Sequence, residues 1–142
     1  MAELPPYPDV RPALERAQAH GLHVTLLTNG GAKATRKAFD RANLAGLIER
    51  VISADEIEHY KPSREVYLHA ARALGARPQS CVLVTAHAWD ARGALAAGLG
   101  VAFVQRQEAM TADLANDLVA SRPSLEALFA DLEQVTEVRR TA

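Results

Sequence analysis

Short apolar segments alternate with helical patterns along most of this chain, and this alternation limits the folds open to it. Four segments are predicted to be buried strands: LHVTLLT (22–28), VISA (51–54), CVLVT (81–85) and GVAFVQR (100–106). A fifth, DLVAS (117–121), is typical of a short edge strand. Apolar strands that alternate with helices indicate a parallel sheet covered on both faces. We therefore expect a three-layer α/β fold.

Helical patterns lie between and around these strands. The first begins with Asp9 as the N-cap and ends at Gly21, and the third opens with Pro62 and closes at Gly75. The five patterns cover residues 9–21, about 34–42, 61–78, 90–98 and 123–135. With 142 residues, 49% of them hydrophobic, the chain is long enough for one domain and too short for two of ordinary size. A single domain over 1–142 is expected.

Charge and composition argue against several classes of partner. The formal net charge is −1, with 16 basic and 17 acidic residues mixed along the chain, so neither a nucleic-acid surface nor an anionic-membrane surface is expected. The N-terminal segment MAELPPYPDV lacks a signal-peptide apolar region, and no apolar run is long enough to span a membrane. The single cysteine, Cys81, excludes an intrachain disulfide. A cytoplasmic protein is expected.

Polar residues follow the strands at the edge where α/β proteins bind ligands. TNGG (28–31) offers a hydroxyl, an amide and backbone N–H groups to an anion, although Asn-Gly is also an ordinary turn signal. Lys61, fixed by the following Pro62, would bring positive charge to a carboxylate, a phosphate or a nucleophilic aspartate. The alternative for Lys61 is a solvated lysine.

The third strand is followed by a second group of candidates. Asp90 is read either as an N-cap, as the ion-pair partner of Lys61, or as a group that positions a water. Trp89 is read as a core anchor or as the wall of a pocket, and His87 as a proton carrier or a loop residue. The remaining histidines show no metal-ligand spacing: His20, His23, His59 and His69.

Three segments in this order carry a family resemblance: LLTNGG, then HYKPSREVYLHAARALG, then VLVTAHAWDARGALAAGLGVAFVQR. Together they resemble the haloacid dehalogenase (HAD) superfamily, most closely its type II 2-haloacid dehalogenases, over about residues 5–130. YKPSREVY and HAWDARGA are the most specific parts. The resemblance implies a HAD-like Rossmannoid core. It also implies hydrolytic dehalogenation of a small 2-haloacid through an ester on an aspartate.

The resemblance also implies roles for the candidate residues. Lys61 would stabilise the nucleophile and the leaving charge, and Asp90 would orient Lys61 and the hydrolytic water. Thr85 would be a supporting hydroxyl. Thr28 and Asn29 would bind the substrate carboxylate or developing anion. Trp89 would line or brace the site, and His87 stands where many dehalogenases have Asn.

The fourth-motif segment bears on metal binding. The phosphatase members of the superfamily hold Mg²⁺ partly through acids in this segment, whereas here Asp90 is its one acid, beside Thr85, Ala86 and His87. Mg²⁺ prefers several oxygen ligands in an octahedron. We therefore expect no cofactor, with Mg²⁺ possible only if the chemistry is phosphatase-like.

The chain departs from the family at its front. No DxxGT-like nucleophile motif and no helical cap segment occur, and LPPYPDV (4–10) resembles the return from the cap. The resemblance therefore implies a C-terminal part of the fold that is inactive alone. The family's first strand lies between the strands predicted at 22–28 and 81–85, so its absence leaves a gap of about 4.8 Å. The two strands could pair directly, receive a strand from a swapped homodimer or another partner, or belong to a longer enzyme.

Two other functions are weighed against the dehalogenase function. A non-catalytic HAD-like remnant or interaction module would bind a partner through its sheet edge. A receiver or dinucleotide-binding domain ranks last, because no phosphate-accepting acid ends a strand and TNGGAKA lacks the GxGxxG spacing.

Overall fold

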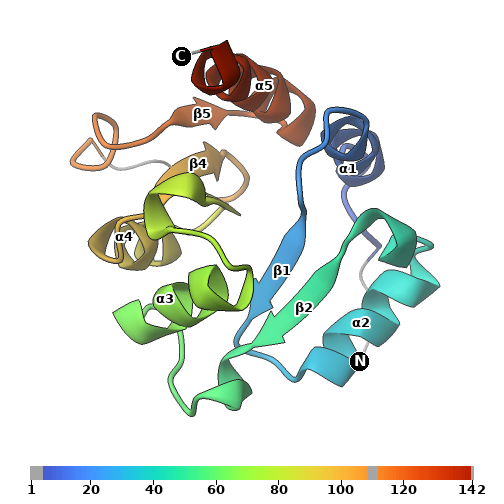
Figure 1. The fold of residues 1–142 in the computed structure, drawn as a ribbon. Coiled ribbons are helices and arrows are strands. Elements are labelled where there is room, and N and C mark those ends of the chain that lie inside the picture. The colour runs from blue at the N-terminus through green and yellow to red at the C-terminus, as the bar shows by residue number, and fades with distance from the viewer. Residues whose placement is uncertain (1–4, 109–111, 142) are drawn as a thin grey trace.

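The computed structural model describes residues 5–108 and 112–141, with side chains described through residue 134 (Figure 1). The first residues of the N-terminal segment, 1–4, lie outside these ranges. The helices are α1 (Val10–Ala19), α2 (Ala32–Arg41), α3 (Arg64–Ala73), α4 (Ala88–Ala96) and α5 (Leu125–Thr141). The strands are β1 (Thr25–Thr28), β2 (Arg50–Ser53), β3 (Val82–Thr85), β4 (Gly100–Val104) and β5 (Ala120–Arg122). The predicted alternation of strands and helices is confirmed.

The strands form two parallel sheets. In one, β1 pairs with β2, with Leu27 opposite Ile52. In the other, β4 lies between β3 and β5. Within the described residues, β1 pairs only with β2 and β3 only with β4. One of the three arrangements considered for the gap, direct pairing of β1 with β3, is therefore wrong for this structure.

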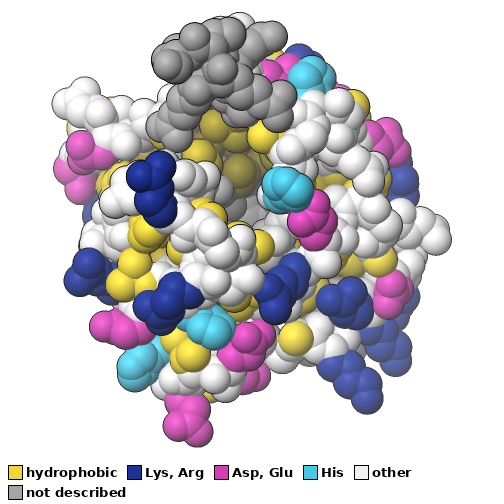
Figure 2. All heavy atoms as spheres, in the orientation of Figure 1, with side chains coloured by type: hydrophobic (Ala, Val, Ile, Leu, Met, Phe, Trp, Pro, Cys, Tyr) yellow, Lys and Arg dark blue, Asp and Glu magenta, His cyan; other side chains and the backbone are white. Residues whose placement is uncertain are grey.

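The strands that border the gap are less buried than their neighbours. Val51, Ile52 and Ser53 of β2 are buried, and so is β4 from Val101 to Val104. All four residues of β1 are only half-buried, although its sequence is TLLT. Figure 2 shows a hollow with hydrophobic side chains at its base, on the face where β1 and the β4 side of the molecule lie apart in Figure 1. An apolar, half-exposed strand with one free edge is the direct result of the gap.

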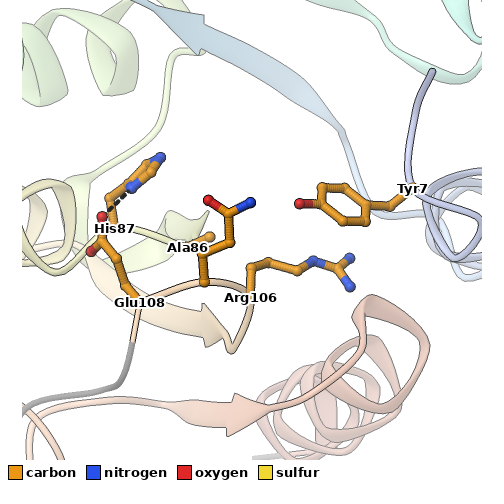
Figure 3. Close-up of a pocket in the computed structure, with 6 residues that line it drawn as sticks. Tyr7, Ala86, His87, Arg106 and Glu108 are labelled. Carbon is orange, nitrogen blue, oxygen red and sulfur yellow. Dashed lines mark hydrogen bonds and ion pairs between the residues drawn. The ribbon is translucent and has the colours of Figure 1, made fainter. Parts of the chain in front are cut away.

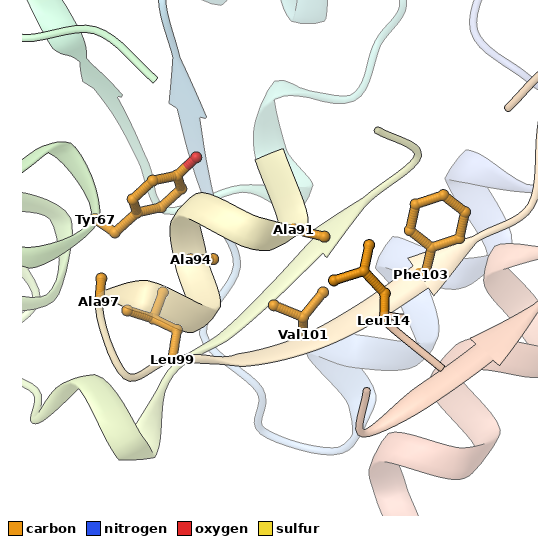
Figure 4. Close-up of a cluster of buried hydrophobic side chains, with 8 residues drawn as sticks. All are labelled: Tyr67, Ala91, Ala94, Ala97, Leu99, Val101, Phe103 and Leu114. Carbon is orange, nitrogen blue, oxygen red and sulfur yellow. The ribbon is translucent and has the colours of Figure 1, made fainter. Parts of the chain in front are cut away.

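Helices tie the two sheets together. One cluster packs α4 against β4 and is extended by Leu27 of β1; its buried members are Tyr67, Ala91, Ala94, Ala97, Leu99, Val101, Phe103 and Leu114 (Figure 4). A second packs α5 on β4 and β5 around Leu128. A third joins α1 to α5 through Ala13, Ala17 and Phe129. None of the helices among the described residues is long and apolar enough to cross a membrane.

Glycine ends two helices as predicted. Gly21 and Gly75 follow α1 and α3 with φ of 69° and 63°. This left-handed conformation is one that glycine adopts without the strain a Cβ would bring.

Asp9 joins three parts of the chain. It precedes α1 as predicted, but its carboxylate does not cap that helix. Instead both carboxylate oxygens accept hydrogen bonds from Arg106 Nη2 at 2.7 Å, and Oδ2 also accepts the N–H of Leu125 at 2.8 Å. The guanidinium of Arg106 lies 4.3 Å from the ring centroid of Tyr7. The predicted cap of α1 therefore caps α5 and holds the end of β4.

The pKa of Asp9 predicts an effect on acid stability. Burial pushes this pKa up, but the N–H of Leu125 and the Arg106 guanidinium outweigh burial and lower it. A depressed folded-state pKa stabilises the fold above the unfolded pKa of about 4, and this stability is lost as pH falls through the folded pKa. Asp9→Asn should lower the melting temperature at pH 7, with the difference from wild type shrinking below about pH 4. Thermal unfolding followed by circular dichroism from pH 7 to 2.5 measures this. Asp40→Asn, on the exposed face of α2, is the control.

Candidate active site

The loop after β1 holds the main chain of Lys61. The Lys61 N–H donates to Asn29 Oδ1 at 2.7 Å, and Asn29 Nδ2 donates to the Lys61 carbonyl at 3.2 Å. The Asn29 amide is thus committed to fixing the segment before α3. Thr28 Oγ1 accepts the N–H of Gly30 at 2.9 Å, which closes the turn. Both residues lie at the predicted rim, and their side chains contact the protein's own backbone.

A buried ion pair joins Lys61 to Asp90. Lys61 Nζ lies 2.9 Å from Asp90 Oδ2, with the two side chains 12% and 5% exposed. Thr85 Oγ1, at the end of β3, donates to the same oxygen at 3.0 Å. Lys61 and Asp90 come from segments 29 residues apart, and parallel strands and the helices after them bring both to one edge. The ion pair predicted for Asp90 is present; the N-cap alternative is wrong, because His87 is the N-cap of α4 and Asp90 lies within the helix, and the water-positioning role stays a prediction.

Tyr67 completes the coordination of Asp90. The sequence pattern assigns this residue only to the buried stripe of α3, and its side chain is indeed fully buried. Its hydroxyl donates to Asp90 Oδ1 at 2.6 Å and to the Asp90 carbonyl at 3.2 Å. Burial, and then the Asp90 carboxylate, raise the pKa of Tyr67 strongly, so the hydroxyl keeps its proton as a donor. A tyrosine in a buried stripe needs a hydrogen-bond partner for its hydroxyl, and this requirement was the sequence signal that pointed to a polar contact of Tyr67.

Gly93 allows α4 to approach Lys61. A Cβ built on Gly93 would lie 2.6 Å from the Pro62 carbonyl oxygen and 2.7 Å from the ring and hydroxyl of Tyr67. These distances are well inside van der Waals contact, so at this position α4 has no room for a larger residue. The close approach sets the depth at which Asp90 meets Lys61.

An aromatic rim lies over this pair. Trp89 is 41% exposed, so it is not a core anchor, and its role as the wall of a pocket stays a prediction. Its ring centroid lies 5.9 Å from Lys61 Nζ, and the His87 ring stacks on it at 5.5 Å with an interplanar angle of 19°. The rim therefore combines a cation, an indole and an imidazole.

Glu108 is a member of the site that the sequence did not indicate. Its Oε1 lies 2.6 Å from His87 Nδ1, and its Oε2 accepts the N–H of Ala88 at 3.0 Å. The hydrogen bond with His87, and next that from Ala88, lower the pKa of Glu108. It follows β4 at no motif spacing from His87, so only the fold reveals the pair. A cavity of about 260 Å³ opens beside it, lined by Tyr7, Ala86, His87, Arg106, Gln107 and Glu108 (Figure 3).

The described residues contain no group of three or more His, Cys, Asp and Glu side chains placed to hold a metal ion. Asp90, the acid of the fourth-motif segment, is bound to a lysine and two hydroxyls. Three of the roughly four acceptor positions of a carboxylate are thus occupied by protein donors. This donor set fits a lysine-centred site better than a Mg²⁺ site.

Gly93→Ala tests the close approach of α4. We expect destabilisation by about 1–3 kcal/mol, because the methyl group must displace backbone or a buried ring. Urea unfolding of the purified chain measures this. Gly46→Ala is the matched control, because a Cβ there meets nothing within 4 Å. Equal stability of the two variants would contradict the role given to Gly93.

Tyr67→Phe tests the hydroxyl on Asp90. Its removal leaves a buried carboxylate oxygen short of a donor, which costs about 1–3 kcal/mol. Tyr60→Phe removes a similar 2.9 Å hydrogen bond, to Asp55, from an exposed tyrosine and should change stability by about 0.5 kcal/mol or less. If the two variants unfold at the same urea concentration, Tyr67 does not support Asp90.

Comparison with known proteins agrees with this geometry. The haloacid dehalogenase-like hydrolase profile matches residues 1–98. (S)-2-haloacid dehalogenase 4A of Burkholderia cepacia is 32% identical over 105 residues, which cover 74% of this chain and 46% of that protein. (S)-2-haloacid dehalogenase 1 of Pseudomonas sp. (strain CBS-3) is 36% identical over 104 residues, covering 73% and 46%.

Solved structures give the same result. A dehalogenase crystal structure superposes with a TM-score of 0.81 at 29% identity, over 87% of this chain and 55% of that one. L-2-haloacid dehalogenase from Xanthobacter autotrophicus with covalently bound chloropropionic acid superposes with a TM-score of 0.70 at 29% identity, covering 75% and 42%. The chain spans about half the length of these relatives. With its profile match and its buried lysine–aspartate pair, the chain belongs to the haloacid dehalogenase-like hydrolase family.

Proposed function

We propose that this chain carries the lysine–aspartate half of a hydrolytic dehalogenase site for small 2-halocarboxylic acids. The observation that supports the proposal is the Lys61–Asp90 pair, buried at the edge where such folds bind ligands. The names of the relatives supply the substrate class, since they are (S)-2-haloacid dehalogenases.

Lys61 acts as a fixed positive charge. An ammonium group has three donors, and one of them is directed to Asp90. The other two are free to stabilise an attacking carboxylate and the charge that develops on the departing halide. Asn29 prevents the Lys61 backbone from moving, and Thr85 and Tyr67 do the same for Asp90. Preorganised charge of this kind lowers a barrier without reorganisation during the reaction.

The loop after β1 binds the substrate carboxylate in this proposal. Helix α2 begins at Ala32 without a side-chain cap at Gly31, so its first backbone N–H groups can hold an anion together with the turn of Thr28 and Asn29. The role of Asn29 is thus divided. Its side chain positions Lys61, and its main chain belongs to the anion-binding turn.

The reaction needs a carboxylate nucleophile that the described residues do not place beside Lys61. Asp90 is already bound, Asp9 pairs with Arg106, and Asp55 accepts from Tyr60. A covalent route requires a carboxylate that displaces halide from C2 and forms an ester, which water then cleaves. We assign this nucleophile to an extended segment between β1 and β3, supplied by a strand-complementing partner or by another part of a longer protein.

The unpaired edges of β1 and β3 support the binding of a segment between them. Besides the free edges of β1 and β3, Thr25 Oγ1 on β1 is the buried side-chain polar atom that lacks a hydrogen-bond partner in the described part of the chain. Buried polar groups in native proteins are normally paired. An added parallel strand would pair both edges, with its carboxyl end beside Lys61.

The second candidate function is a non-catalytic interaction module. The same unpaired edges favour it, because strand addition needs only backbone groups and apolar side chains. In that case Lys61 and Asp90 would affect stability and not chemistry.

Co-expression tests both functions. The chain alone should release no chloride from (S)-2-chloropropionate. Together with the part of (S)-2-haloacid dehalogenase 4A that precedes the matched region, it should form a complex that does. Lys61→Met should abolish chloride release and leave the complex intact, whereas Lys37→Met, on the exposed face of α2, should change neither chloride release nor complex formation. A complex that forms but releases no chloride, while intact 4A is active in the same assay, would favour the interaction module.

A further inference from the structure

A buried serine, Ser53, lies at the end of β2 beside the turn that follows β1. The sequence pattern places it only in a strand, and the residue is 3% exposed. Its hydroxyl donates to the Gly30 carbonyl at 2.9 Å and accepts the N–H of Asp55 at 3.2 Å. Ser53 therefore joins the end of β2 to the turn in which the proposed function places the substrate carboxylate.

Two side chains fix the main chain of Gly30 in this turn. Its N–H donates to Thr28 Oγ1 at 2.9 Å, and its carbonyl accepts from Ser53 Oγ. The peptide bond between Gly30 and Gly31 is trans, so its C=O and its N–H point in opposite directions. Because Ser53 holds the carbonyl, the Gly31 N–H must point away from Ser53.

The Gly31 N–H is available to a ligand. Among the described residues it has no hydrogen-bond partner, and Gly31 is exposed. Gly31 is the N-cap of α2, and no side chain caps this ten-residue helix. A backbone donor at the start of a helix lies where the helix dipole favours negative charge. The orientation of one peptide plane thus decides whether this donor faces an anion.

Ser53 is itself held from its other side. Its N–H donates to Glu56 Oε1 at 3.1 Å, which completes a capping box. Glu56 Oε2 lies 2.9 Å from Nε2 of His69 on α3. The hydrogen bond with His69, and next that from Ser53, lower the pKa of Glu56, so its carboxylate stays an acceptor at neutral pH. A continuous line of hydrogen bonds therefore runs from α3 through Ser53 to the turn.

We propose that Ser53 is a positioning residue of the substrate-binding turn: by holding the Gly30 carbonyl, it directs the Gly31 N–H to the carboxylate of a small 2-haloacid. The inference rests on the proposed function for its substrate. The substrate carboxylate takes no part in bond breaking, so a hydrogen bond to it stabilises bound substrate and transition state alike. Loss of this bond should therefore raise KM and leave kcat nearly unchanged.

The first experiment removes the Gly31 N–H. Proline lacks this donor and requires a φ near −65°, and Gly31 already has a φ of −62°. Gly31→Ala keeps the donor, and a Cβ there lies at an ordinary 4.0 Å from Asp55 Oδ2. In the co-expressed complex, the KM of Gly31→Pro for (S)-2-chloropropionate should exceed that of Gly31→Ala about 10-fold or more, the loss expected for a hydrogen bond to a charged group. Equal KM values for these two variants would overturn the proposal.

The second experiment removes the hydroxyl that holds the turn. In the same complex, Ser53→Ala should raise KM about 10-fold with kcat within about twofold of wild type, and Ser53→Thr, which keeps a hydroxyl, should recover a lower KM. The matched control is Ser121→Ala on β5, which removes a hydroxyl bonded to Gln105 at 3.0 Å in the other sheet and should keep the wild-type values. A purely structural role would not confine the effect to KM. A wild-type KM in Ser53→Ala, or a fall in kcat without a rise in KM, would overturn the proposal.

A third measurement needs no activity. In NMR spectra of the chain alone, the carbonyl ¹³C resonance of Gly30 and the amide resonance of Gly31 should move in Ser53→Ala and stay in place in Ser121→Ala. Unchanged resonances in Ser53→Ala would show that Ser53 does not hold the turn, and the proposal would fail.

These measurements separate the two proposals. If the wild-type complex releases no chloride, the proposed dehalogenase function fails, and the spectra alone decide whether Ser53 orients Gly31. If the complex is active and the KM of Gly31→Pro equals that of Gly31→Ala, the dehalogenase function stands and the Gly31 N–H does not bind the substrate.

Discussion

The rest of the structure depends on one buried ion pair, Lys61 with Asp90. Moving two charges out of water costs several kcal/mol each, and their attraction offsets this only when further hydrogen bonds complete the geometry. Here those bonds come from Thr85 and Tyr67 on Asp90, and from Asn29 on the Lys61 main chain. The ends of β1 and β3, the start of α4, and α3 with the loop before it must all be in place. The pair is therefore a condition that the fold must meet, and the proposed function is built on it.

The divided sheet becomes understandable in these terms. The open edges of β1 and β3 in the described residues would be costly if they were sealed from water, because unpaired buried backbone groups are expensive. Both strands are instead half-exposed, so water can satisfy much of their edges. The helices, and Leu27 packed against the α4 cluster, hold the two sheets near each other. Part of the apolar surface of β1 and β3 is therefore left unburied in the described residues.

Sequence reasoning succeeded where a general geometric rule applies. Parallel strands end at one edge, so Lys61 and Asp90 could be placed together although 29 residues separate them. It failed where the outcome depends on the direction of one side chain. Asp9 has the residue type and position of an N-cap for α1, but its carboxylate accepts the N–H of Leu125 instead. The Asn29 side chain bonds to the Lys61 backbone. Glu108 could not be found at all, since only the packing of the β4 end against α4 brings it to His87.

The exposed aromatic side chains around the site extend this argument to water. Tyr7, Tyr60 and Trp89 are 50%, 51% and 41% exposed. Tyr7 lines the cavity, Tyr60 precedes Lys61 in the sequence, and the Trp89 ring lies near the Lys61 ammonium of the ion pair. In the proposed function, these side chains would be covered by the element that completes the site. In the proposed function, displacement of halide by a carboxylate would proceed best where water is excluded, and the later hydrolysis would need a single water. A cover over Trp89 that leaves the cavity beside His87 open would meet both requirements. It would also explain why the lysine–aspartate pair is buried while the histidine beside it is open.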